Sequence, residues 1–473
     1  MNKLFAIYIS TILLLGIYAS VSVADNTKVR KPIDPMFVGK CTQVDSAFAY
    51  FEDRSLDSIA EELKVNGYTS VCITSTGGGK FPLADVLKKH GIYSRLLIVP
   101  MNGTYDSSSM PTGWEKWRIV CRDPGYKIFE YFCLNDPDFR IYKQKQLVDT
   151  LLQNPAFTAI DLPEPQIPSI GGPDDPGYAC FCDDCKKKFF AMHPEETDLP
   201  NFTDPSSPKY WKTDESLYKK WVEFRVNTVV DFLNFLVNGP GGIRERCPKI
   251  KIITWTLGCQ SRGTDVVKIE RENQGMDAAA VVSKVKPYAH CIQTDWPNWS
   301  IPDLPADHVK NYEPYLKSIR SVNKKIPVVI QTDSGSLPAM HRSFEWLSNI
   351  DKIAKQVGFT QTFDYQYHLA SDFYTKAPRL AVARLSKSSK QLTLVFDMYL
   401  DPTIASDVSI YKLSLGKVIN AKADGNLVKL EVDGVTPRVK VTVNKASNNP
   451  ERLIHKGYEQ KTSGPVTVNV VRE

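Results

Sequence analysis

Glu164 and the cysteines that follow it are the residues whose types and spacing first point to chemistry. The segment DLPEPQIPSIGGPDDPGYACFCDDC, residues 161–185, contains a glutamate between two prolines and then three cysteines spaced C-x-C-x-x-C. Pro163 and Pro165 restrict the backbone on both sides, which predicts a stiff extended exit that holds the Glu164 carboxylate at a fixed angle. A carboxylate held in this way is suited to proton transfer.

The cysteine turn indicates a metal site. Cys180, Cys182 and Cys185 are too close in the sequence for easy mutual disulfides. A turn with this spacing can direct three thiolates at one ion, and tetrahedral zinc needs a fourth ligand.

Two further carboxylates stand at the ends of apolar runs, in the triplets QTD of residues 293–295 and 331–333. In VVIQTD, residues 328–333, side chains alternate between two faces, and one face carries Val329, Gln331 and Asp333. The other face is apolar and is expected to pack on helices, so Gln331 and Asp333 are expected to point inward.

The same count places Gln293 and Asp295 on an inner face, whereas Asp364 has the opposite parity from Gln361. Cleavage of a glycosidic bond needs two opposed carboxylates, one acting as acid and the other as nucleophile or base. We therefore predict Glu164 as the acid/base and Asp333 as the second carboxylate, with Asp295 as the alternative.

Polar and aromatic side chains near these carboxylates are the predicted contacts to a sugar. They are Gln293, Gln331, Trp296, Trp255 and Tyr365. The alternative is that strand-end acids only cap the next helix. His341 and His368 are interpreted as hydrogen-bonded structural groups rather than ligands.

These residues need a scaffold that brings strand ends together. Short β-branched or apolar runs alternate with amphipathic segments, the pattern of βα units and a parallel sheet. The predicted strands are Met36–Val44, Tyr68–Thr74, Tyr93–Pro100, Phe157–Leu162, Lys249–Leu257, His290–Asp295, Pro327–Thr332 and Phe359–Tyr365. Eight strands predict a (β/α)₈ TIM barrel over residues 36–385, with an active site at the carboxyl ends of the strands.

Helical segments separate these strands. In residues 306–322, large apolar side chains recur at helical spacing and leave lysines on the other face. The predicted helices include Ser55–Val65, Phe139–Leu152, Ser216–Val237, Ala306–Val322 and Ser343–Val357. The alternative fold, an open doubly wound sheet, would need fewer strands and a glycine-rich first turn. TGGGK at residues 76–80 lacks the spacing of a phosphate-binding loop.

The pattern changes from about Lys387, where short alternating runs are separated by turn residues. This texture predicts a small all-β sandwich over residues 387–473. The order VFD, LDPTIASDVSIYKLSLG and then a V-x-L-x-V strand resembles the bacterial Ig-like modules of secreted enzymes.

The N-terminus predicts export. Residues 1–3 precede an apolar run from Leu4 to Tyr18, and Ser22 and Ala24 stand where a signal peptidase needs small residues. We predict a signal peptide over residues 1–24, no transmembrane segment, and a soluble protein in the periplasm or outside the cell. Export favours disulfides, so the remaining six cysteines are either paired or free: Cys41, Cys72, Cys121, Cys247, Cys259 and Cys291.

Charge by itself gives little information about the partner. The chain of 473 residues has 59 basic and 53 acidic residues and a formal net charge of +6. These charges are spread along the sequence without a basic stripe, so nucleic acid is not an expected partner.

Three motifs in order resemble the family 42 β-galactosidases and related barrel glycosidases. They are Cys133 in YFCLNDPDFRIY, then Glu164 in DLPEP, then CFCDDCKKKFF from Cys180. The resemblance implies an acid/base role for Glu164. It also implies a structural zinc held by Cys133, Cys180, Cys182 and Cys185, whose four thiolates would leave no open position for catalysis.

The chain departs from the family at two positions. The family has asparagine directly before the acid/base glutamate, where this chain has Pro163, and a glutamate nucleophile on strand seven, where it has Asp333. Aspartate is shorter than glutamate by about one methylene. The distance between the two carboxylates is therefore open, and with it whether the reaction retains or inverts the anomeric configuration. The prediction is an exported glycoside hydrolase; the alternative is a non-catalytic carbohydrate-binding or cell-surface protein on the same barrel.

Overall fold

The structure is a computed structural model that describes residues 34–75, 78–126, 130–168, 171–259, 265–294 and 301–473. Residues 35–473 form one compact unit. The predicted signal peptide, residues 1–24, lies outside the described residues. Among the helices that the structure describes, none is both long enough and apolar enough to cross a lipid bilayer.

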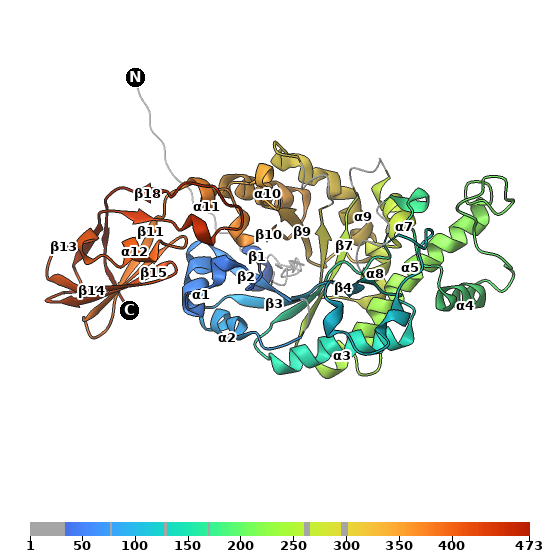
Figure 1. Cartoon of the computed structure of the whole chain (residues 1–473), viewed down its shortest axis with the longest axis horizontal. Coiled ribbons are helices and arrows are strands. Elements are labelled where there is room, and N and C mark those ends of the chain that lie inside the picture. The colour runs from blue at the N-terminus through green and yellow to red at the C-terminus, as the bar shows by residue number, and fades with distance from the viewer. Residues whose placement is uncertain (1–33, 76–77, 127–129, 169–170, 260–264, 295–300) are drawn as a thin grey trace, which may run out of the picture. The chain divides into compact units, whose positions relative to one another are not determined.

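Eight parallel strands close into a barrel, so the predicted TIM-barrel fold is confirmed (Figure 1). Around the barrel the strands follow the order β1, β10, β9, β8, β7, β6, β3, β2. They are β1 Lys40–Val44, β2 Tyr68–Ser75, β3 Tyr93–Ile98, β6 Ala159–Leu162, β7 Lys251–Leu257, β8 Ala289–Gln293, β9 Val328–Asp333 and β10 Gln361–Tyr365. A long hairpin follows β3, in which the two-residue strands β4 Gly103–Thr104 and β5 Glu130–Tyr131 pair antiparallel and residues 105–129 lie between them.

Helices connect the strands and surround the barrel (Figure 1). They are α1 Leu56–Val65, α2 Pro82–Lys89, α3 Pro137–Gln153, α4 Asp183–Met192, α5 Glu215–Asn238, α6 Ile243–Arg246, α7 Val266–Gln274, α8 Ala278–Val285, α9 Glu313–Val322, α10 Phe344–Val357 and α11 Asp372–Thr375. Side-chain caps fix several of their starts: the Ser55 hydroxyl accepts from Ser58 N, and Asp136 and Ser343 cap α3 and α10 in the same way.

The two faces of β9 pack as the alternation predicts. Val328 and Ile330 lie in a cluster with Tyr315 and Ile319 of α9, outside the barrel. Val329 lies in a separate cluster with inward side chains of other strands, including Trp255 and Phe363. Gln331 and Asp333 share the parity of Val329 and therefore lie on the inner side of the sheet.

An ion pair between the neighbouring strands β3 and β6 lies inside the barrel. The Arg95 Nε donates to Asp161 Oδ2 at 2.8 Å, and both side chains are fully buried. Trp255 Nε1 donates to Asp161 Oδ1 at 2.7 Å, and Arg95 also donates to the Cys41 sulfur. Burying two charges is costly unless each is paired and hydrogen-bonded, a condition that these contacts meet.

All-β sheets follow the barrel. One has the strand order β14, β15, β12, β11, β20 and another has β13, β16, β19. The strands are β11 Leu380–Leu385, β12 Gln391–Phe396, β13 Tyr411–Leu413, β14 Lys417–Asp424, β15 Leu427–Asp433, β16 Lys440–Val443, β17 Ala446–Ser447, β18 Thr462–Ser463, β19 Val466–Asn469 and β20 Val471–Arg472, with α12 Pro402–Ala405 between them. The first C-terminal sheet thus begins at Leu380, within the range predicted for the barrel.

Asn426 links these sheets to α1. It is fully buried, and its Oδ1 accepts from Arg54 Nη2 at 2.8 Å and from Ser58 Oγ at 3.0 Å. Its Nδ2 donates to Phe396 O at 2.7 Å. Arg54 Nη2, Ser58 Oγ and the Asn426 amide are therefore satisfied at this contact, whereas the buried Arg54 Nη1 has no hydrogen-bond partner in the described part of the chain.

Candidate functional site

Glu164 lies just beyond the carboxyl end of β6. Its backbone has φ of +49°, in the left-handed region that is uncommon for residues other than glycine. The extended exit predicted from the two prolines is therefore wrong at this residue. Such a conformation costs of order 1–3 kcal/mol and persists where surrounding structure enforces it, often at functional sites.

The Glu164 carboxylate is held from β8. Gln293 Nε2 donates to Glu164 Oε1 at 2.8 Å. Burial raises the pKa of Glu164, and the Gln293 hydrogen bond opposes this effect. The side chain therefore keeps its proton to a higher pH than an exposed glutamate, as a general acid requires.

Asp333 ends β9 and is 4% exposed. Its carboxylate accepts from Ser336 Oγ at 2.6 Å and from Ser336 N at 3.1 Å. Burial raises the pKa of Asp333, and the Ser336 hydrogen bonds lower it. The residue is thus a buried carboxylate on the inner side of the barrel mouth.

Two tyrosines lie near the carboxylates. Burial raises the pKa of Tyr365, and the charges of Asp333 and Glu164 raise it further. Burial, Glu164 and Tyr365 raise the pKa of Tyr105 to about 12. One phenol therefore lies within electrostatic range of both carboxylates, and a second lies near Glu164.

Tyr105 and Tyr131 were not among the predicted site residues. Tyr131 is in β5 and Tyr105 directly follows β4, so the hairpin brings both tyrosines to Glu164. The available signal was an aromatic residue directly after Gly103–Thr104, but strands of two residues leave no periodic pattern.

Two amide oxygens at the mouth lack partners. Oε1 of Gln293 and Oε1 of Gln331 are buried and accept no hydrogen bond within the described part of the chain. Buried polar atoms are normally satisfied, so acceptors of this kind are suited to bind hydroxyl groups of a ligand.

Trp255, another predicted contact to a sugar, lies in the barrel interior. Trp255 is 1% exposed and packs edge-on against Phe363, while its N–H is bonded to Asp161. Its predicted role in stacking on a sugar is therefore wrong, because the ring is part of the barrel interior. Asp295 and Trp296 lie outside the described residues.

Three further polar side chains, Asp364, His368 and His341, make contacts of their own. Asp364 accepts from Tyr68 OH at 3.1 Å, on the side of β10 opposite to Phe363, and burial raises its pKa to about 7. His368 stacks on Tyr50, and His341 packs against Tyr374. Burial lowers the pKa of both histidines, to about 3 for His368 and about 4 for His341.

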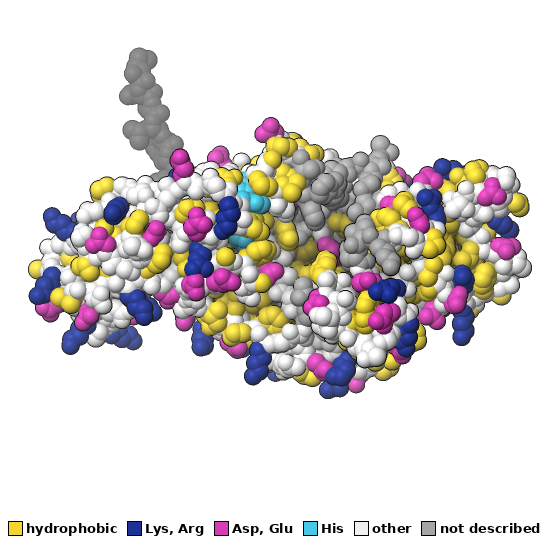
Figure 2. Space-filling view, viewed as in Figure 1, with side chains coloured by type: hydrophobic (Ala, Val, Ile, Leu, Met, Phe, Trp, Pro, Cys, Tyr) yellow, Lys and Arg dark blue, Asp and Glu magenta, His cyan; other side chains and the backbone are white. Residues whose placement is uncertain are grey.

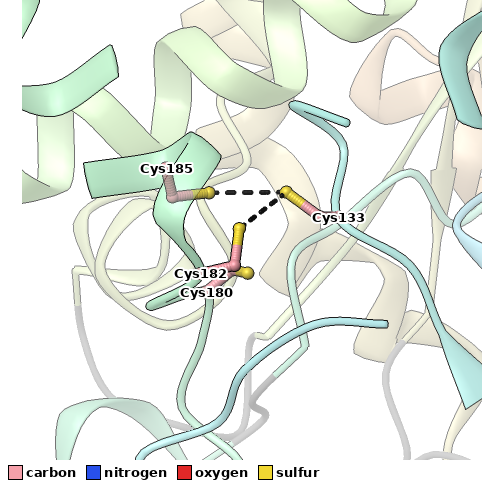
Figure 3. A group of neighbouring side chains, drawn as sticks. All are labelled: Cys133, Cys180, Cys182 and Cys185. Carbon is pink, nitrogen blue, oxygen red and sulfur yellow. Dashed lines mark hydrogen bonds between the residues drawn. The ribbon is translucent and has the colours of Figure 1, made fainter. Parts of the chain in front are cut away.

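The four cysteines named by the resemblance meet at one place. Cys133 precedes α3, and Cys180, Cys182 and Cys185 lie at the start of α4; Figure 3 shows their side chains pointing toward one another. The sulfur of Cys133 is 3.5 Å from that of Cys185 and 3.3 Å from that of Cys182.

All four sulfurs lie within 4.8 Å of one another. A tetrahedral zinc site with Zn–S bonds of about 2.3 Å has sulfur–sulfur separations of about 3.8 Å, so this set fits such an ion. Asn135 supports the cluster, since its N and Nδ2 each lie 3.3 Å from a sulfur, those of Cys133 and Cys185.

No disulfide links the cysteines. All ten cysteines lie in the described ranges, and none of them forms a disulfide there. Cys41 and Cys72 come closest to each other outside the cluster that holds Cys133, with sulfurs 3.9 Å apart inside the barrel.

Charged side chains of both signs are interspersed on the face shown in Figure 2.

No family model matches the sequence, and neither does any curated protein. The structure is similar to the glycoside hydrolase domain of PgaB (BpsB) from Bordetella bronchiseptica, with 10% sequence identity and a TM-score of 0.51 over 71% of this chain and 96% of that one. This likeness shows the fold, an eight-stranded barrel shared with a glycoside hydrolase domain.

Weaker likenesses include Gan42B, a GH42 β-galactosidase from G. stearothermophilus, with 15% identity and a TM-score of 0.49 over 70% of this chain and 51% of that one. Another is the glycoside hydrolase domain of PelA from Pseudomonas aeruginosa, with 11% identity and a TM-score of 0.38 over 70% of this chain and 95% of that one. This chain thus covers about half the length of the β-galactosidase.

Proposed function

We propose that this protein is an exported glycoside hydrolase that cleaves an oligo- or polysaccharide with two carboxylates. The observation that carries the proposal is the pair Glu164 and Asp333 at the carboxyl ends of β6 and β9, both within electrostatic range of Tyr365. Active sites of barrel enzymes form at this end. The fold shared with glycoside hydrolase domains supports the same conclusion.

Glu164 is the general acid/base in this proposal. Burial raises its pKa and so favours the neutral form, which can protonate the leaving oxygen of the glycosidic bond, after which the carboxylate can accept a proton from water. Asp333 supplies the second carboxylate, and Asp295 is the alternative. Gln293, Gln331, Trp296 and Tyr365 contact sugar hydroxyls and rings.

The cysteine cluster has a supporting role. We propose a structural zinc held by Cys133, Cys180, Cys182 and Cys185, which fixes the loop that returns from Glu164 to α4. When bound, the ion would cross-link two distant segments; four thiolates complete its coordination sphere and leave the chemistry to the carboxylates. Residues 1–24 act as a signal peptide, and residues 387–473 act as an Ig-like module.

Release of reducing sugar from a polysaccharide panel tests the activity. Glu164→Gln and Asp333→Asn are each expected to lower kcat about 10²–10⁴-fold relative to wild type. Asp364→Asn is the matched control, because Asp364 ends the neighbouring strand but has the opposite side-chain parity. Sugar binding without turnover by wild type would favour the carbohydrate-binding alternative and exclude the enzyme.

A further inference from the structure

A cavity adjoins the mouth of the barrel. Its volume is about 230 Å³, and Tyr126, Tyr131, the Arg118–Glu130 pair and Pro168 are among its lining residues. Pockets for drug-sized ligands start at roughly 300 Å³, so this one has room for about one ring.

The cavity is joined to the Glu164 segment by backbone contacts. Asn102 O accepts from Phe132 N at 2.7 Å, and Asn102 Nδ2 donates to Gln166 O at 2.5 Å. These bonds fix the β4–β5 hairpin, which contains Tyr131, against the exit that carries Glu164. Burial and then the Glu164 charge raise the pKa of Tyr131, in agreement with that placement. Tyr131 is therefore a wall shared by the mouth and the cavity.

The lining has the chemistry of a sugar subsite. Arg118 and Glu130 form a bidentate pair, with Nε to Oε2 at 2.6 Å and Nη2 to Oε1 at 2.9 Å. Their side chains are 39% and 32% exposed, so the pair can exchange hydrogen bonds with hydroxyls while its charges cancel. The rings of Tyr126 and Tyr131 offer apolar faces to C–H groups.

Tyr126 is held against the chain backbone at Gly177. A Cβ at Gly177 would lie 2.2 Å from the Tyr126 ring, so the missing side chain is what allows the ring to take this position. Alanine at this position would push the ring away without removing it.

We propose that this cavity is a subsite for one neutral sugar ring of a chain whose scissile bond lies at Glu164. The inference rests on the proposed function and names its substrate class, a saccharide that continues past Tyr131. Substrates long enough to reach the cavity are cleaved faster than shorter ones.

The test uses oligosaccharides of increasing length, prepared from the polysaccharide that the wild-type protein cleaves. Adding the ring that reaches the cavity should raise the wild-type kcat/KM roughly tenfold, as expected for stacking together with hydrogen bonds. Tyr126→Ala and Gly177→Ala should each remove most of this increment. Both variants should keep kcat/KM for the shortest substrate within about twofold of the wild-type value. Tyr288→Ala, near the amino end of β8, is the matched control that should keep it.

An increment that persists in both variants would overturn the subsite. If the wild-type protein cleaves no saccharide, the proposed function fails, and the subsite is judged by calorimetric binding of neutral oligosaccharides prepared from each polysaccharide of the test panel. Affinity that is lower by about fivefold or more in Tyr126→Ala supports it. Equal affinities, or no binding at all, overturn it.

Discussion

The side-chain amide of Gln293 donates to the carboxylate of Glu164 at 2.8 Å, joining the ends of β8 and β6 across β7. A hydrogen bond to the ionised form of an acid lowers its pKa, whereas burial raises it. The balance between these two effects determines the pH at which Glu164 gives up its proton.

Gln293→Leu should therefore move the alkaline limb of the kcat/KM profile to higher pH. Loss of a hydrogen bond worth about 0.5–1.5 kcal/mol raises the pKa of Glu164 by roughly half to one unit, because one unit corresponds to 1.36 kcal/mol. The acid form then persists further into the alkaline range. Gln331→Leu is the control, since no Gln331 hydrogen bond to Glu164 is found in the described residues; a limb that stays in place in Gln293→Leu contradicts the prediction.

Replacing Cys185 with serine should release the metal. We expect about one zinc per wild-type chain and little in Cys185→Ser, measured by elemental analysis of the purified proteins. The free energy of unfolding should fall by about 3 kcal/mol or more, the stabilisation from a ligand at over roughly 100 times its Kd. Cys259→Ser removes a buried thiol outside the cluster and should keep the zinc. Equal zinc contents in the two variants would refute the site.

Glu270 should make stability depend on pH. It is fully buried in α7, its oxygens have no hydrogen-bond partner in the described structure, and burial raises its pKa well above the usual value of 4.5. Above pH 4.5 the unfolded chain ionises this group while the folded chain keeps it neutral, so its contribution becomes destabilising as pH rises.

Glu270→Gln should therefore be more stable than wild type at pH 8, by about 1 kcal/mol or more, with the difference vanishing near pH 4. Urea unfolding at both pH values measures this effect. Glu215→Gln is the surface control, because the Glu215 side chain is 77% exposed. A Glu270→Gln variant that is less stable at both values would contradict the assignment.

Asn426→Ala should weaken the contact between α1 and the C-terminal sheet. The change removes the acceptor that Arg54 Nη2 and the buried Ser58 Oγ share, while Arg54 keeps its contacts with Ser58 and Glu62, so the expected cost is about 1–3 kcal/mol in the free energy of unfolding. Asn444→Ala, at an exposed position of the same C-terminal region, should change stability by less than about 0.5 kcal/mol. A loss of similar size in both variants would show that the interface contact is not the cause.

The local pattern of residue types was sufficient to predict the barrel and the inner face of β9. Period-two runs separated by helical segments identify strands without any knowledge of their neighbours, and alternation alone places Gln331 and Asp333 on the inner side. The spacing of Cys180, Cys182 and Cys185 likewise requires only one turn of chain.

Trp255 shows where local pattern was insufficient. Its parity is inward, but whether an inward ring is open to solvent depends on how deep it lies and on what fills the barrel. Asp161 and Phe363 come from other strands and occupy its N–H and its face. Tyr131, in contrast, was not predicted at the site. It belongs to a two-residue strand, which is too short to give a periodic pattern, and the pairing of this strand with β4 brings it to Glu164.

The sequence by itself thus determined which segments form the barrel, which carboxylates stand at the strand ends and how three of the thiols are spaced, because each depends on neighbours within a few residues. Only the tertiary structure decided the left-handed backbone of Glu164, the hydrogen bond from Gln293 and the approach of Tyr131 to Glu164. These features join residues far apart in the chain, and the energy that maintains them comes from packing and burial rather than from local preference.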